Sequence, residues 1–173
     1  MNQGELLNRL KAFEHKEVFF GPQGFSVITK TAALKKAQIG YAIDKKGASL
    51  VNSDVGNWQS SWFVIATDTE LGDPYFIDFN DAHLAVYTAV AEEENQWQTT
   101  LVSASLDGFE KCLTAIYQQC EQKSAMYLPD DNCIFDLQVL ESFGKQLVEF
   151  SQTNDFWQYF FIGYVDWLRD EHV

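Results

Sequence analysis

The segment from Trp62 to Ser103 constrains the fold of this 173-residue chain more than any other part of it. Its first run, Trp62–Ala66, is almost continuously apolar, as expected of a strand that is covered on both faces. Pro74 fixes one φ angle and removes a backbone donor, so residues 71–74 are predicted to form a tight connection. Strands are predicted at residues 62–66, 75–79, 83–90 and 97–103, and their short turns imply an antiparallel meander.

Helical periodicity flanks this meander on both sides. Before it, Leu6, Leu7, Leu10 and Phe13 recur at helical spacing and predict an amphipathic helix of about three turns. After it, Ser105 is typical of an N-cap, and apolar spacing predicts helices over residues 106–120, 135–147 and 153–168. The fold class is therefore predicted to be α+β, with a central, mostly antiparallel sheet and helices packed before and after it.

The remaining segments are predicted from shorter signals. Residues 21–24 contain two glycines and a proline and indicate a loop, and residues 31–37 a short helical turn. A strand is expected at 39–44, closed by a turn at 45–47, and a loop at 54–57. The last helix is very aromatic and either caps the core or exposes a dimerisation stripe.

Length and composition indicate one domain covering residues 1–173, with 46% hydrophobic residues to build a single core. The N-terminal residues contain no secretory signal, and no apolar run approaches the length of a membrane span. The three cysteines lack metal-site or disulfide spacing and are expected to be reduced thiols. We therefore expect a cytoplasmic protein without membrane association.

The net charge of −13 is unevenly distributed. Residues 47–110 contain eleven acidic residues and no Lys or Arg, whereas residues 1–46 contain eight basic and four acidic residues. Such a field repels nucleic-acid phosphates and attracts basic partners. The charge pattern thus argues against nucleic-acid binding and favours a basic protein partner.

Catalytic motifs are scarce. The three histidines match no metal-binding pattern, and His83 is predicted to be a solvated turn residue. Cys112 is expected to be a buried, inert thiol. The chain is therefore expected not to be an enzyme and to use no catalytic residue, metal or cofactor.

Five carboxylates fall within fourteen residues around the predicted hairpin, namely Asp68, Glu70, Asp73, Asp78 and Asp81. Their spacing matches no calcium loop, and three of them flank turns, where Asp is common for structural reasons. Turn capping, partner binding and metal or acid–base chemistry are all compatible with the pattern. Glu92-Glu93-Glu94 similarly indicates a solvated hairpin tip or a contact for a basic partner.

The ordered motifs Ala37–Asp44, Trp62–Ala66, Gly72–Asp78, Val86–Ala89 with Trp97, and Ser105 with Phe109 and Leu113 resemble the SUKH superfamily. The resemblance covers residues 34–120, and residues 121–173 form a C-terminal extension beyond it. The family's usual Leu-Pro segment after the first helix is absent, since Leu-Pro occurs only at residues 128–129.

The resemblance implies an α+β domain of mixed sheet with helices packed around it and, among bacterial members, an immunity protein that neutralises a toxin, often a nuclease. It supplies no catalytic residues. The predicted function is a non-catalytic immunity protein against a basic toxin; the alternative is a regulatory protein-binding scaffold of the cell-wall-regulator type. The predicted contact residues are Asp68, Glu70, Asp73, Asp81, Glu92, Glu93 and Glu94, with Trp58 as an exposed aromatic anchor beside them. The oligomeric state is left open.

Overall fold

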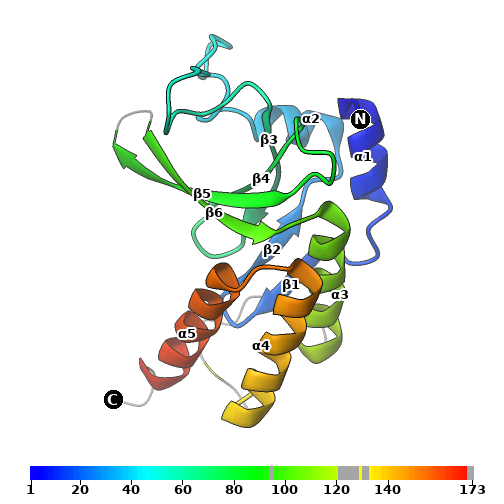
Figure 1. Ribbon diagram of the computed structural model, residues 1–173, viewed down its shortest axis with the longest axis vertical. Helices are drawn as coiled ribbons and strands as arrows, with labels where there is room; N and C mark the ends of the chain where they lie inside the picture. The colour runs from blue at the N-terminus through cyan, green and yellow to red at the C-terminus, as the bar shows by residue number, and fades with distance from the viewer. Residues whose placement is uncertain (94–95, 121–128, 130–132, 171–173) are drawn as a thin grey trace.

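The computed structural model describes residues 1–93, 96–120, 129 and 133–170. Within them the chain forms one six-stranded sheet in the order β1-β2-β3-β4-β5-β6, and every neighbouring pair is antiparallel. The predicted α+β class is confirmed, with helices before and after the sheet (Figure 1). The strands are β1 Glu17–Phe20, β2 Gln23–Val27, β3 Trp62–Asp68, β4 Pro74–Asp78, β5 Val86–Glu93 and β6 Gln96–Ser103.

Three of the five helices begin at capping side chains that the sequence provides. They are α1 Gln3–Lys11, α2 Thr31–Lys36, α3 Leu106–Cys120, α4 Leu137–Ser151 and α5 Asp155–Asp170. The Asn2 side chain accepts from the Glu5 amide at the start of α1, and Ser105 Oγ accepts from the Gly108 amide at the start of α3. The prediction that Ser105 caps α3 is therefore confirmed.

Of two predictions about the first third of the chain, one is half right and one is wrong. Residues 21–24, expected as a loop, contain the turn of the β1–β2 hairpin, in which Gly21 has a φ of 65°, and the first two residues of β2. Residues 39–44, expected as a strand, form turns, because the Gln38 carbonyl accepts from the amides of Tyr41, Ala42 and Ile43. The Gln38 side chain also exchanges two hydrogen bonds with the Val64 backbone, beside a bulge in β3.

The sheet has a core on each face. On one face the larger core includes Phe25, Tyr75, Phe109 and Phe160, so α3 and α5 pack against β2 and β4. On the other face Trp58, Val64, Phe76 and Ala89 form a smaller core, which the segment around residues 37–58 covers. Figure 1 shows α3, α4 and α5 together on one side of the sheet and the loops that follow α2 on the other.

The last helix caps the larger core. Phe156, Trp157, Phe160, Tyr164 and Leu168 are all buried. Trp157 Nε1 donates to the Val102 carbonyl oxygen over 3.1 Å, which joins α5 to β6. The buried face of α5 therefore caps the core, which is one of the two roles predicted for this helix.

Candidate functional site

The meander determines which acidic residues can act together, because its turns alternate between two ends of the sheet. The β1–β2 and β3–β4 turns lie at one end, together with the end of β5 and the start of β6, and the β4–β5 turn lies at the other. Thr69 Oγ1 donates to the Pro22 carbonyl oxygen over 3.0 Å, joining the first two of these turns. We use the term acidic hairpin end for the carboxylates at this end of β3, β4 and β5, namely Asp68, Glu70, Asp73, Glu92 and Glu93. Figure 1 shows the β3–β4 turn and the end of β5 on the same side of the molecule.

Asp78 and Asp81 lie at the opposite end, so the prediction that five carboxylates surround one hairpin is wrong. β4 has five residues and separates Asp78 from Asp73 by about 17 Å. Asp78 Oδ1 accepts from the Asn80 amide, and Asp81 Oδ1 accepts from the His83 amide over 2.7 Å. Asp78 and Asp81 therefore have the turn-capping role, and Asp81 does not share a surface with the acidic hairpin end.

Asp68 and Asp73 form the partly buried part of the acidic hairpin end. Asp68 is buried, and its Oδ2 accepts from the amides of Glu70 and Leu71 at 2.9 and 2.6 Å. Its Oδ1 is buried without a hydrogen-bond partner. Burial and the neighbouring Asp68 raise the pKa of Asp73. Both carboxylates thus stay close together with only one of the two Asp68 oxygens hydrogen-bonded.

Trp58 is not the exposed anchor that the sequence suggested, because only 1% of its surface is accessible. Its ring packs on Phe76 at 4.7 Å between centroids and on Tyr41 at 4.9 Å. Tyr41 and Trp97 cover it, are half-buried, and lie 5.1 Å apart. Trp58 therefore fills the smaller core, and the outer aromatic surface belongs to Tyr41 and Trp97.

Tyr41 connects this aromatic surface to the carboxylates. Burial and the nearby Asp73 raise the pKa of the Tyr41 hydroxyl. Trp97 pairs with Ala91, two residues before Glu93. Tyr41 was not predicted as a site residue because it lies in the segment predicted as a strand. Its contacts with Trp58 and Trp97 depend on the turns whose amides donate to the Gln38 carbonyl oxygen.

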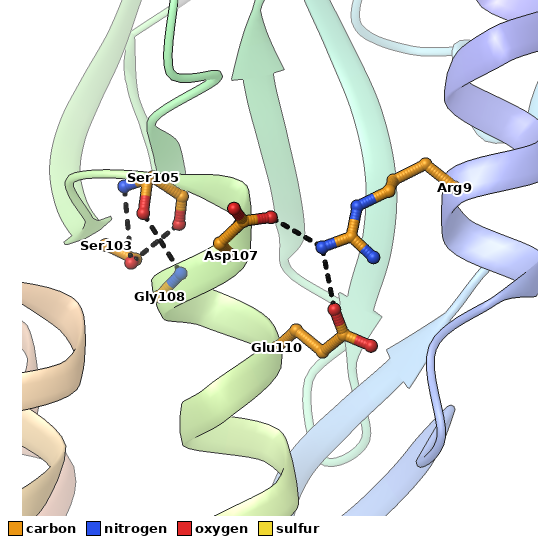
Figure 2. A network of polar contacts seen from close by, with 6 residues as sticks. All are labelled: Arg9, Ser103, Ser105, Asp107, Gly108 and Glu110. Carbon is orange, nitrogen blue, oxygen red and sulfur yellow. Dashed lines mark hydrogen bonds and ion pairs between the residues drawn. The ribbon is translucent and has the colours of Figure 1, made fainter.

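Two of the eleven carboxylates in residues 47–110 form ion pairs far from this surface. Arg9 on α1 donates to Asp107 Oδ1 and lies 2.8 Å from Glu110 Oε2, both on α3 (Figure 2). None of the other carboxylates in residues 47–110 that the structure describes lies within 4.0 Å of a basic side chain. Glu94 lies outside the described residues. The acidic hairpin end is therefore uncompensated within the described part of the chain.

The described histidines and cysteines lie in surroundings typical of structural residues. His15 stacks on Tyr117 with centroids 3.5 Å apart, and His83 is exposed in a turn, as predicted; His172 lies outside the described residues. Cys112 is buried, burial raises its pKa, and its Sγ donates to the Leu147 carbonyl. None of the three cysteines is in a disulfide. Within residues 1–93, 96–120, 129 and 133–170, no three His, Cys, Asp or Glu side chains are placed to hold a metal ion.

Comparisons with protein-family models, curated proteins and solved structures gave no match to this chain. In the described ranges, every helix is too short or too polar to span a lipid bilayer.

Proposed function

We propose that this protein is a non-catalytic, cytoplasmic immunity protein of the SUKH type that binds and neutralises a basic toxin, such as a nuclease. The observation that carries the proposal is the acidic hairpin end, whose carboxylates have no basic neighbour among the described residues. A basic partner would supply the missing counter-charge. The motifs of residues 34–120 that resemble the SUKH superfamily support the same function.

The two parts of this surface would contribute differently to binding. Exposed carboxylates such as Glu70, Glu92 and Glu93 steer a basic partner toward the surface and raise association rates by roughly 10–10³. Half-buried aromatic residues such as Tyr41 and Trp97 provide apolar area at low entropic cost, as is typical of interface hot spots. Asp73 is near enough to Tyr41 for its charge to raise the pKa of the Tyr41 hydroxyl, so one basic side chain could contact a ring and a carboxylate together.

The test is to express the gene immediately upstream with and without this one. We expect its product to be toxic alone and harmless together with this protein. The variant Glu70→Lys/Glu93→Lys should protect less, with an association rate at least about tenfold lower at low salt.

The matched control is Glu14→Lys/Glu149→Lys, which changes the net charge equally at exposed positions outside the acidic hairpin end. This variant should protect as well as the unmodified protein. The proposal fails if the neighbouring product is not toxic, if its toxicity is unaffected, or if the two double variants protect equally.

A further inference from the structure

A groove of about 550 Å³ runs between α4 and α5 on the outside of the helical layer. Its apolar lining includes Leu140, Gly144 and Val148 on α4, and Phe161, Ile162 and Val165 on α5. These positions recur three or four residues apart along both helices, which is the spacing of one helix face. α5 is about 24 Å long, so the groove extends over most of a helical hairpin.

The floor of the groove belongs to the core, whereas part of its rim is exposed. Leu140 is buried, and Val148, Phe161 and Val165 pack against the larger core. α5 also buries Phe156, Phe160 and Tyr164 in the larger core. A surface helix of a globular domain normally has one apolar stripe. Here Ile162 is 47% exposed and Leu137, at the α4 end of the groove, is 60% exposed. Two adjacent helices with exposed apolar side chains beside the groove between them have the form of half a four-helix bundle.

The charges around the groove differ from those of the rest of the chain. Lys145 and Arg169 are the only basic residues between positions 133 and 170, and both line the groove. Each has an acidic neighbour on its own helix: Glu141 lies 2.7 Å from Lys145, and Asp166 lies 3.8 Å from Arg169. With two acidic and two basic residues, the four charges sum to zero.

We infer that this groove is the interface of a homodimer, in which α4 and α5 of two copies form a four-helix bundle. Two copies that each carry a net charge of −13 repel one another at most surfaces. At the groove this repulsion is absent. In a two-fold interface each residue contacts its counterparts reciprocally, so helices that each carry one acidic and one basic residue can place opposite charges across the axis.

The charge pattern also distinguishes a second copy from other occupants. A strongly basic partner would gain nothing from a rim whose charges sum to zero, and it would be attracted instead to the acidic hairpin end. The dimer is therefore independent of the proposed toxin-binding surface, which lies on the sheet hairpins. The dimer would leave that surface open in both copies.

The test is sedimentation velocity on the full chain from about 1 to 100 µM. We expect a mass twice the 19.8 kDa of one chain at high concentration. Ile162→Lys should shift the protein to a monomer and raise the apparent dissociation constant at least about tenfold. Tyr159→Lys is the matched control, because Tyr159 lies on the same helix, is 73% exposed and does not line the groove.

Charge reversal gives a second, positive readout. Lys145→Glu/Arg169→Glu makes the rim all acidic, and Glu141→Lys/Asp166→Lys makes it all basic, so each variant should be monomeric alone. An equal mixture of the two should reassociate as a heterodimer. Far-UV circular dichroism checks that these exposed substitutions leave the fold intact. The inference is overturned if the unmodified chain is monomeric at about 100 µM, the highest concentration tested. It is also overturned if Ile162→Lys and Tyr159→Lys have the same apparent dissociation constant, or if the mixture of the two charge-reversal variants stays monomeric.

Discussion

The amide of Asp68 donates to the carbonyl oxygen of Asp73 over 2.8 Å, which holds these two acidic residues opposite one another at the ends of β3 and β4. Like charges at facing cross-strand positions destabilise a sheet. Burial and, as the smaller cause, the charge of Asp68 raise the pKa of Asp73, so repulsion from Asp68 adds to the cost of burying the Asp73 carboxylate. An arrangement that costs stability at neutral pH is typical of a binding surface, and it supports the proposal that a basic partner contacts the acidic hairpin end.

Replacing Asp73 by Asn should stabilise the folded protein at neutral pH. Because the pKa of Asp73 is raised in the folded chain, its ionisation favours unfolding, and this penalty is fully present above the folded pKa. Asp73 is only partly buried and screened by water, so we expect a gain of about 0.5 kcal/mol, or about 1–2 °C in Tm, at pH 7.

The same gain should vanish below about pH 3, where the carboxyl group is protonated in both the folded and the unfolded chain. Scanning calorimetry of the two proteins at pH 7 and pH 3 measures the difference. An equal or lower Tm for Asp73→Asn at pH 7 would contradict the predicted repulsion.

Replacing Asp68 by Ala should destabilise the protein. Asp68 Oδ2 accepts from the amides of Glu70 and Leu71, and alanine would leave both donors without their acceptor. The expected loss is about 1–3 kcal/mol in the free energy of unfolding, measured by urea denaturation. Glu70→Ala serves as the comparison because the Glu70 side chain is exposed, and it should change stability by less than about 0.5 kcal/mol.

Much of the fold could be predicted because the signals were local. Trp62–Ala66 and the turn before Pro74 predict β3 and β4, and the apolar spacing after Ser105 predicts α3. β1 and β2 were missed because they have only four and five residues, too few for a clear alternation. The strand predicted at 39–44 failed because Gln38 binds the backbone of Val64, 26 positions away, and no local pattern reveals such a contact.

The sequence indicates which acidic residues could form the candidate site, but the prediction groups them wrongly. Asp73 and Asp81 are close in sequence, yet β4 carries the chain from one end of the sheet to the other between them. The alternation of turns in a meander implies this separation, so the predicted topology already contained the signal. The burial of Trp58 was different, because it depends on non-local packing against Phe76 and Tyr41.

Replacing Arg9 by Ala should loosen the contact between α1 and α3. The guanidinium group binds both Asp107 and Glu110, and its hydrogen bond to Asp107 raises the pKa of Arg9. Arg9 is about a third exposed, so we expect a loss of only about 0.5–1.5 kcal/mol, decreasing between 0.05 and 0.5 M NaCl as the Debye length shortens.

Urea denaturation of Arg9→Ala at the two salt concentrations measures this effect. Lys11→Ala is the control, since Lys11 is an exposed basic residue on the same helix, and it should cost less than about 0.5 kcal/mol. A loss that does not depend on salt would mean that packing of the Arg9 side chain on Phe13, not its charge, stabilises the contact.

Replacing Trp157 by Phe tests whether α5 is part of the core. The indole is fully buried, and its Nε1 donates to the Val102 carbonyl oxygen. Phenylalanine keeps an aromatic ring but cannot donate, and it leaves unfilled volume beside β6. Losing a buried donor and part of a buried ring should together lower the free energy of unfolding by about 2–3 kcal/mol.

Tyr159→Phe removes a polar group from the same helix at a position that is 73% exposed, and it should change stability by less than about 0.5 kcal/mol. If α5 were attached only through its groove face, both substitutions would have small effects. A large loss for Trp157→Phe alone would instead mean that α5 folds together with the sheet. The groove face would then be free to contact a second copy without unfolding the domain.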